Sequence, residues 1–537
     1  MGERVGVETS GARKKRVNLL IGASALTIAG GAAVVALAPL AAGPEGQKDC
    51  GDVLPAIPPE NGHLARQKVA QPAWAQKGGT VNDASCLSHT AIAGVVTPQG
   101  EKDVADALDY ARATGLTISP AGVRHSMGGQ AFRRGGIMLD MRQLNRIELH
   151  PETSTVTVGP GATWHAIQNA IHPRFAVKAM QSTDIFTVGG SISVNAHGMD
   201  QHAGAIMDSI RSLRIMLADG RIVTASRDEN PDLFRLVVGG YGLFGIILSA
   251  DLDVVPNDIL ASERQVVPAT ELPKRLQQLV ADPSIGLMYA HLSTAPGSLL
   301  DEALIYSYRK TPDQDGRRAA LTDVGWVKMR RLTVNLAKHS DVFQTLKWWT
   351  EKNLEHRFEA CTVTRAQAMR DGEACLVSRN DPMHDSVPYL RNSLRNDTDI
   401  LHEYFVPKER LLPFIDGLRR IVRSHDANLL NASIRVVGAE QNILTYAPQP
   451  AYSVVLYFNQ RTDAAGNAKM ARLTSDLIDL TQEQGGRFFL PYQLYYSPEQ
   501  LERSYPEIRS FFAEKRKWDP DGLFNNTWYA RYAPSFG

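Results

Sequence analysis

The sequence predicts an α+β fold with at least two domains, preceded by one transmembrane helix. The chain has 537 residues, of which 43% are hydrophobic and 21% charged, so it is long enough for more than one core. Helix-like and strand-like segments alternate from residue 81 onward, and they become longer after residue 257. Before them stands an uncharged, mostly apolar run, residues 17–42.

Residues 17–42 have the features of a membrane anchor. At 1.5 Å per residue, this run is long enough to cross the roughly 30 Å hydrocarbon layer. The basic residues 13–16 precede it, which predicts that residues 1–16 are cytoplasmic and that the catalytic body is extracytoplasmic. A signal peptide cleaved near Ala41 and Ala42, giving a secreted protein, is the alternative. Residues 43–80, rich in Pro and Gly, are then a linker.

Residues 81–257 form the first predicted domain. Residues 101–114 place apolar side chains on one helical face, and Gly115 stands where a C-terminal cap belongs. Residues 116–119 follow as a short strand. Strand pairs are expected at 146–149 with 155–158 and at 213–217 with 221–224, the second across Asp219-Gly220.

A second predicted domain covers residues 258–515. Its helices are expected at 409–424 and 468–484, and its strands at 434–437 and 452–458. In the last segment, 516–537, the residues Asp519-Pro-Asp-Gly522 predict a turn.

Charge and cysteine content exclude some classes of function. The 58 Lys and Arg residues nearly balance the 57 Asp and Glu residues, so there is no bulk electrostatic reason to expect nucleic acid as a partner. A small-molecule or lipid-linked substrate is expected instead. The four cysteines form no CxxC pair, which argues against a structural metal, and their pairing or freedom stays open.

A GxGxxG match at Gly240–Gly245 is not a dinucleotide fingerprint. Such a fingerprint needs a strand before it and a helix after it. Here residues 232–238 are helix-like and residues 246–255 are strand-like, which is the reverse order. The glycines therefore predict a tight turn that leads into a strand.

Two other glycine loops are more informative. Residues 120–129 follow a predicted strand and can present backbone N–H groups to a pyrophosphate. Residues 187–198 contain Gly189 and Gly190, which permit close backbone approach to a flat ligand. Taken without further context, both segments are also compatible with ordinary turns of an α+β domain.

Four motifs in order, PAGVRHS, FTVGGSISVNAHG, ADGRIVTAS and GGYGLFGII, resemble the FAD-binding domain of the vanillyl-alcohol-oxidase (PCMH-type) flavoproteins. The likeness is nearest to the sugar-alcohol and aldonolactone oxidases and the decaprenylphosphoryl-ribose oxidases. It implies a two-subdomain PCMH-type FAD-binding fold over 81–257, an α+β substrate (cap) domain, and a C-terminal segment 516–537 that returns to the FAD-binding domain.

The resemblance also implies cofactor contacts. The first loop would lie beside the FAD pyrophosphate, and His125 matches the histidine that is joined covalently to the flavin in the sugar-oxidase branch; a non-bonded histidine is the alternative. His197 would lie close to substrate and ring, or else be a structural histidine. The implied FAD-binding residues are Gly122, Arg124, His125, Ser126, Gly129, Val188, Gly189, Gly190, Ser193, His197, Gly198, Ile247 and Asn526, with Asn525 as an alternative to Asn526.

Catalytic groups are expected from His197 and from the second domain. Resemblance to the polyol oxidases places Arg435, Tyr457 and Tyr492 on strands that face the flavin. The sequence departs from that pattern at three positions: Ser433 replaces an acidic residue, Tyr457 a histidine, and Tyr492 a lysine. An Arg such as Arg435 can stabilise negative charge on substrate or reduced flavin, although a surface strand position explains it equally well.

The implied function is FAD-dependent oxidation of a CH-OH group on a sugar-like, polyol or aldonolactone substrate by hydride transfer to flavin. The electron acceptor is expected to be O2 or a membrane carrier. One alternative is a membrane-anchored FAD dehydrogenase that passes electrons to a quinone or cytochrome. The other is a flavin-free binding protein on the same fold.

Overall fold

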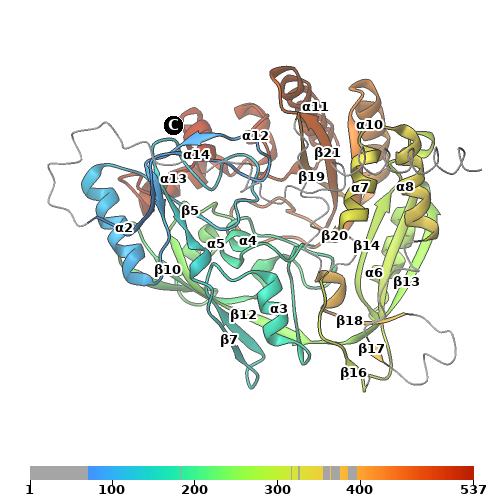
Figure 1. Cartoon of the computed structure of the whole chain (residues 1–537), viewed down its shortest axis with the longest axis horizontal. Helices are drawn as coiled ribbons and strands as arrows, with labels where there is room; N and C mark the ends of the chain where they lie inside the picture. The colour runs from blue at the N-terminus through green and yellow to red at the C-terminus, as the bar shows by residue number, and fades with distance from the viewer. Residues whose placement is uncertain are drawn as a thin grey trace, which may run out of the picture.

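The computed structural model describes residues 71–181, 183–315, 317–323, 327–354, 363–364, 375–384 and 396–537. In these ranges, three main sheets of four, six and eight strands carry the helices (Figure 1). The four- and six-stranded sheets lie together in one half of the molecule, and the eight-stranded sheet forms the other half.

The four-stranded sheet holds the first glycine loop. Helix α2 connects β4 to β5, buries the apolar face that its spacing predicts, and ends at Gly115, whose φ of 68° is left-handed. The strand order is β1-β4-β6-β5, with β4, β6 and β5 parallel. The elements are β1 (Trp74–Lys77), β4 (Gly94–Val96), α2 (Glu101–Thr114), β5 (Ile118–Ala121) and β6 (Ile137–Asp140).

The six-stranded sheet contains both predicted hairpins. Strands β7 and β8 pair in antiparallel fashion, as do β10 and β11. Helix α5 precedes β12 at the GxGxxG match, so the predicted helix-turn-strand order is confirmed. The elements are β7 (Ile147–His150), β8 (Thr155–Val158), α3 (Trp164–Ile171), β9 (Phe175–Val177), α4 (Val188–Ser193), β10 (Ile210–Met216), β11 (Ile222–Ser226), α5 (Pro231–Val237) and β12 (Ile246–Pro256).

The eight-stranded sheet has the order β18-β13-β15-β14-β20-β21-β19-β22. The predicted helices near 409–424 and 468–484 are present as α10 and α11. The strands are β13 (Ile259–Pro268), β14 (Ile285–Leu292), β15 (Glu302–Lys310), β18 (Leu376–Ser378), β19 (Asp397–Pro407), β20 (Asn428–Val437), β21 (Ala451–Arg461) and β22 (Arg487–Phe488). The helices are α6 (Leu272–Val280), α7 (Val327–Ala337), α8 (Asp341–Asn353), α10 (Leu411–Ser424) and α11 (Ala464–Glu483).

The two faces of this sheet differ because side chains alternate along each strand. On β19, Tyr404 points toward α10, where its ring centroid lies 6.0 Å from that of Phe414. Its neighbour Glu403 therefore points to the opposite face, where it meets a histidine of the glycine-loop half. This face carries the candidate site.

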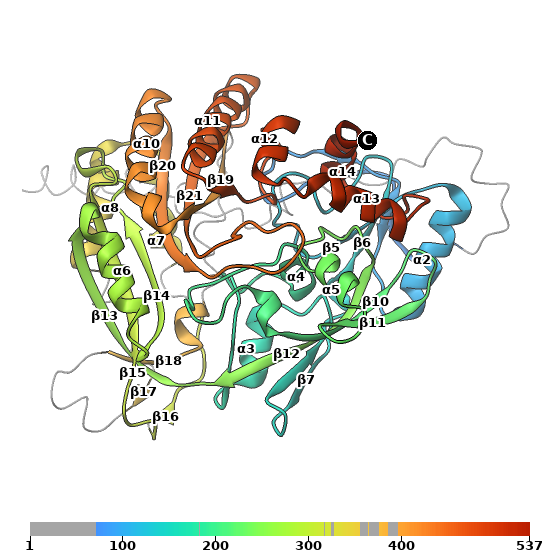
Figure 2. The same cartoon turned by 180° about the vertical axis from the view of Figure 1, so that it is seen from behind.

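The C-terminal segment lies on the four-stranded sheet. Ile118 on β5 donates its N–H to Leu523 at 2.7 Å and accepts from the N–H of Asn525 at 3.0 Å. Figure 2 shows α13 (Ile508–Trp518) and α14 (Thr527–Tyr532) beside the N-terminal half of the chain. The first and the last described segments of the chain therefore pack in one hydrophobic core. The exact domain boundaries stay predictions.

The predicted single-pass membrane localisation is corrected by the structure. No helix in the described ranges combines the length and the apolar character that crossing a bilayer requires. Even α11, with 20 residues, carries charged side chains such as Lys469, Arg472 and Asp476. Residues 17–42, on which the prediction rested, and the linker up to residue 70 lie outside the described ranges.

The cysteines are oxidised where the structure describes them. Cys86 and Cys375 are both disulfide-bonded, so neither is a free thiol.

Candidate active site

The two glycine loops lie directly against each other. A Cβ atom on Gly122 would stand 1.9 Å from the Thr187 Oγ1, so the first loop can approach α4 only with glycine at this position. Gly190 on α4 is exposed, and beyond its chain neighbours and the backbone of α4 only the Thr187 Oγ1, at 3.2 Å, lies within 4 Å of its Cβ position among the described residues. The joined loops therefore leave a side-chain-free surface at Gly190.

The first loop is anchored at its C-terminal end. The Gly129 N–H donates to Asp83 Oδ2 at 3.0 Å, and the Met127 N–H donates to the Pro491 carbonyl at 2.7 Å. Gly129 has a left-handed φ of 71°, and Arg124, a buried residue, has a left-handed φ of 55°. A loop with these constraints has little freedom, which suits the binding of a rigid ligand.

His125 and Ser126 are half-buried on this loop. The His125 ring meets Phe186 edge-on, with ring centroids 4.5 Å apart. Phe186 belongs to the second glycine motif, so this contact is a further link between the two loops.

The second loop divides into exposed and buried positions. Ser193 is half-buried, and its Oγ donates to the Gly189 carbonyl at 2.7 Å. Val188 and Ile247 are buried in the core, and a Cβ on Gly198 would stand 2.1 Å from the Met180 carbonyl oxygen. Their side-chain positions thus serve packing, and any contact from them to a ligand would come from the backbone.

The C-terminal asparagines have different environments. Asn526 donates from Nδ2 to the Tyr241 carbonyl at 2.9 Å and accepts from the Tyr529 N–H at 2.9 Å, so its side chain is already engaged as a helix cap. The Oδ1 atom of Asn525 is buried and has no hydrogen-bond partner within the described part of the chain. Of the two, Asn525 has the free acceptor.

A buried histidine-glutamate pair joins the two halves of the molecule. His197 Nε2 lies 2.5 Å from Glu403 Oε1, and the two residues are 4% and 5% exposed. Ser453 Oγ donates to the same carboxylate oxygen at 2.6 Å, and the Tyr492 hydroxyl donates to Glu403 Oε2 at 3.3 Å. Glu403 is therefore the shared acceptor of groups from the glycine-loop half and the sheet.

Charges around Glu403 keep it ionised. Burial alone raises the pKa of Glu403, but its hydrogen bonds with His197 and Ser453 and the charge of Arg435 offset this and hold the pKa below its usual value. Burial raises the pKa of Tyr492 well above its usual value, so its hydroxyl stays protonated and can donate. Burial lowers the pKa of Arg435, and the facing Glu403 acts in the opposite direction.

His197 keeps one ring nitrogen available. Its Nδ1 is buried and has no hydrogen-bond partner among the residues that the structure describes. A buried polar atom without a partner is costly, so it points to a ligand group that is bound there in the working protein. The ring lies among Phe405, Tyr446 and Phe489, with centroid distances of 5.4, 5.7 and 6.5 Å.

The structure brings His197, Arg435 and Tyr492 together but places Tyr457 elsewhere. The Tyr457 hydroxyl donates to Asp399 Oδ2 at 3.1 Å, and Asp399 pairs with Lys338 Nζ at 2.6 Å. Asp399 precedes Glu403 by four residues on β19, which is about 13 Å along an extended strand. Burial raises the pKa of Asp399 to about 6.

An aromatic and cationic wall on neighbouring strands extends the site. Tyr289 on β14 stacks on Tyr306 of β15, with ring centroids 4.5 Å apart and planes 10° apart. His291 lies 5.4 Å from Tyr306, and the Arg264 guanidinium carbon lies 4.7 Å from the centroid of the same ring. On the paired strands β14 and β20, Tyr289 precedes Ala290 and Arg435 follows Ile434, and Ala290 pairs with Ile434, so the wall is next to Arg435.

Sequence reasoning missed Glu403 and this wall. On β19 the residues that share the face of Glu403 are Asp397, Asp399, Leu401, Phe405 and Pro407, a mixture of polar and apolar side chains that shows no regular alternation. No local pattern marks Glu403, because its partner His197 is 206 positions away in the chain.

The glycine loops fit an FAD cofactor. They combine a contact that only glycine permits, an exposed Gly190, and half-buried His125, Ser126 and Ser193 at one place. Two buried polar atoms without partners in the described ranges, His197 Nδ1 and Asn525 Oδ1, supply further groups for a ligand.

Comparison with known proteins agrees with this fit. The profile of the family described as "FAD binding domain" matches residues 92–226, which include both glycine loops. Decaprenylphosphoryl-beta-D-ribose oxidase from Mycolicibacterium smegmatis is 25% identical over 425 residues, which is 76% of this chain and 88% of that protein.

Two fungal proteins are similar over a shorter stretch. FAD-dependent monooxygenase tpcD from Cochliobolus heterostrophus is 32% identical over 197 residues, 35% of each chain. FAD-linked oxidoreductase fogF from Aspergillus ruber is 34% identical over 162 residues, 29% of this chain and 32% of that protein. The matched stretch is thus about a third of the length of these fungal relatives. Together with the geometry of the loops, the comparisons show that the chain carries a PCMH-type FAD-binding domain and is similar to FAD-dependent oxidoreductases.

Proposed function

We propose that this protein oxidises a CH-OH group of a sugar-like, polyol or aldonolactone substrate by hydride transfer to FAD. The observation that supports it most is the buried His197–Glu403 pair, in which one imidazole nitrogen is held and the other is available. The proposal also includes His125 as the point of covalent attachment of FAD and O2 as the electron acceptor.

The residues that would hold the cofactor come from both loops. Gly122 and Ser126 would lie beside the pyrophosphate, while Gly190 and Ser193 would border the ring system, because these positions are the ones with open or half-exposed surroundings. When bound, FAD supplies the hydride acceptor that alcohol oxidation needs.

His197 is the proposed base. Its Nδ1 would accept the hydroxyl proton of the substrate, and the ionised Glu403 would stabilise the positive charge that the imidazole gains. Ser453 and Tyr492 hold the Glu403 carboxylate in place by donating to it. Arg435 would stabilise negative charge that develops on the substrate oxygen.

The proposed substrate class follows from the wall beside this pair. Half-buried Tyr289, stacked on the buried Tyr306, offers an aromatic face, and Arg264 and His291 offer polar groups next to it. Sugar and polyol chains present CH groups to aromatic faces and hydroxyl groups to polar side chains. The name of the mycobacterial relative, a ribose oxidase acting on a lipid-linked sugar, supports testing small and lipid-linked sugars together.

The test is a substrate panel on the FAD-loaded full chain without oxygen. Sugar alcohols, aldonolactones, free sugars and polyprenyl-phosphate sugars are added singly, and loss of the visible flavin absorbance is followed. At least one CH-OH compound is expected to bleach the flavin, and admission of O2 should restore the colour with release of peroxide. Bleaching by dithionite but by none of these compounds would overturn the proposal.

If a compound bleaches the flavin but O2 restores it slowly, the acceptor part of the proposal is wrong. An artificial quinone that restores the colour rapidly would then identify a dehydrogenase.

A further inference from the structure

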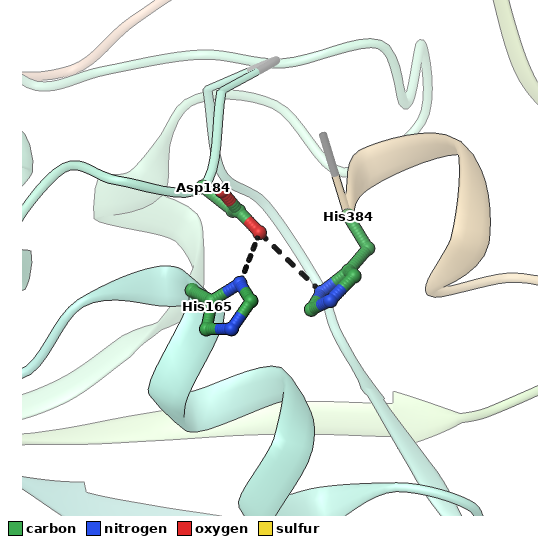
Figure 3. A group of neighbouring side chains, drawn as sticks. All are labelled: His165, Asp184 and His384. Carbon is green, nitrogen blue, oxygen red and sulfur yellow. Dashed lines mark hydrogen bonds and ion pairs between the residues drawn. The ribbon is translucent and has the colours of Figure 1, made fainter. Parts of the chain in front are cut away.

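A second cluster of side chains lies where the two halves of the molecule meet. His165 belongs to α3, Asp184 to the loop before α4, and His384 follows the short 3-10 helix Asp381–Met383 (Figure 3). Asp184 bridges the two imidazole rings from the side, with Oδ2 2.8 Å from His165 Nδ1 and 3.4 Å from His384 Nδ1. The rings are stacked, with centroids 4.5 Å apart.

The backbone fixes these three positions. The His165 N–H donates to the Asp184 carbonyl at 2.8 Å, which holds the start of α3 against the loop. Asn380, at the start of the short helix, donates from Nδ2 to the Phe175 carbonyl at 2.9 Å. The segment that carries His384 is therefore bonded to the FAD-binding half independently of the cluster.

The donor set is that of a transition-metal site. Two imidazole nitrogens and one carboxylate oxygen lie within 4.8 Å of one another. This is the ligand number and type of three-residue zinc sites, in which donors stand about 2.0–2.2 Å from the ion and water completes the shell. A tetrahedral shell of that size needs donors about 3.3 Å apart. The two distances from Asp184 Oδ2 to the imidazole nitrogens, 2.8 and 3.4 Å, are close to this value.

Two further observations point to a cation. Asp184 is 0% exposed, yet its Oδ1 has no hydrogen-bond partner within the described ranges. A buried carboxylate oxygen without a partner is costly unless a positive charge lies nearby. A second carboxylate, Asp323, is within 3.9 Å of His165 Nδ1, and Gln168 Oε1 is 2.9 Å from His384 Nδ1, so additional oxygen donors surround the three.

We propose that His165, Asp184 and His384 bind a divalent first-row transition metal, with Zn2+ as the fitting ion. On binding the ion, each imidazole would carry its proton on Nε2 and present its Nδ1 lone pair, so His384 would give up its hydrogen bond to Gln168 Oε1. The ion would clamp the segment after β18 onto α3, and so tie the eight-stranded sheet to the FAD-binding half. Because α3 and the short helix are far apart in sequence, no spacing motif marks this site, and cysteine spacing could not reveal it.

The alternative is a metal-free cluster in which Asp184 accepts hydrogen bonds from both rings. Metal binding separates the two. Tag-free, FAD-loaded full chain is equilibrated with Zn2+ and desalted, and bound zinc is measured by mass spectrometry alongside the thermal midpoint. About one Zn2+ per chain is expected, with a midpoint that rises on zinc addition and falls on chelation.

Variants locate the site. His165→Ala, at a half-buried helix position, and the isosteric Asp184→Asn are each expected to weaken zinc binding at least about tenfold. His202→Ala, an exposed histidine of the same half, is the matched control and should bind zinc like the wild type. Flavin absorbance and circular dichroism show that each variant is folded. No stoichiometric zinc in the wild type, or equal binding in all variants, would overturn the proposal.

Discussion

His197 and Glu403 stand 206 residues apart in the chain, yet their side chains meet at 2.5 Å across the junction of the two halves. Neither half alone contains the pair. Glu403 also accepts from Ser453 and Tyr492, so the site forms only when the eight-stranded sheet is docked on the glycine loops.

Arg435 and Tyr492 both act on Glu403, but their substitutions should differ in effect. Arg435→Met removes a charge from a buried site, so the rate of flavin reduction by substrate should fall about 100-fold. Tyr492→Phe removes one long hydrogen bond of 3.3 Å, so the rate should fall about tenfold or less. Stopped-flow absorbance measures both rates. Equal losses in the two variants would show that the charge of Arg435 has no role of its own.

Gly122→Ala should impair cofactor binding. The new Cβ would meet Thr187 Oγ1 at 1.9 Å, and separating the loops costs about 1–3 kcal/mol. Purified variant should contain less FAD than the wild type and unfold at a lower temperature. Gly297→Ala, in the short 3-10 helix Pro296–Ser298, is the matched control, because this glycine is exposed and no described atom beyond its chain neighbours and that helix lies within 4 Å of its Cβ position. Normal FAD content in Gly122→Ala would contradict the close contact of the loops.

Covalent attachment is tested at His125. Acid precipitation of the wild type should leave a yellow pellet, because a covalent flavin stays with the denatured chain. His125→Ala should give a colourless pellet with the flavin in the supernatant, while His150→Ala, a half-buried histidine of the β7 strand, should keep the colour. A colourless pellet from the wild type would contradict covalent attachment, and His125 would then be only a loop residue that packs on Phe186.

Glu440 should make stability depend on pH. Its carboxylate accepts from Asn195 Nδ2 at 2.5 Å and from the Tyr446 N–H at 2.6 Å, but burial raises its pKa to about 8. The folded protein therefore holds this proton to higher pH than the unfolded chain. The associated stability is complete below the ordinary value of 4.5 and is lost as the pH rises toward 8.

Glu440→Gln mimics the protonated acid and should remove this loss. Its thermal midpoint should exceed that of the wild type by several degrees at pH 8, and the difference should vanish near pH 4. Glu152→Gln, at an exposed turn, should follow the wild type at both pH values. A variant less stable than the wild type at pH 8 would show that the ionised carboxylate is the stabilising form.

Much of the fold is local enough to be predicted. The helix at residues 101–114 and its Gly115 cap follow from apolar spacing and from glycine's freedom at positive φ. The hairpin at residues 210–226 follows from the Asp219-Gly220 turn signal. The helix-turn-strand order around the GxGxxG match could also be predicted, because the residues of α5 and β12 have clear helical and strand periodicities.

The site is predictable only in part. The glycine loops are contiguous motifs, so Gly122 and Gly190 could be chosen from sequence, but Glu403 depends on which face of β19 meets the glycine-loop half. Tyr457 illustrates the reverse problem. The resemblance placed this residue on a strand that faces the site. The register of β21 on β19 pairs Tyr457 with Leu401, however, and its hydroxyl donates to Asp399 and not to Glu403.

The most direct test of this account is single-turnover reduction of the flavin in Glu403→Gln under anaerobic conditions, with the best substrate of the panel. The change keeps the shape of the side chain but removes the charge that would stabilise a protonated His197. We predict intact FAD content and a rate of flavin reduction lower by about 100-fold to 10,000-fold. A variant that is folded, holds FAD and is reduced as fast as the wild type would contradict the role of the His197–Glu403 pair.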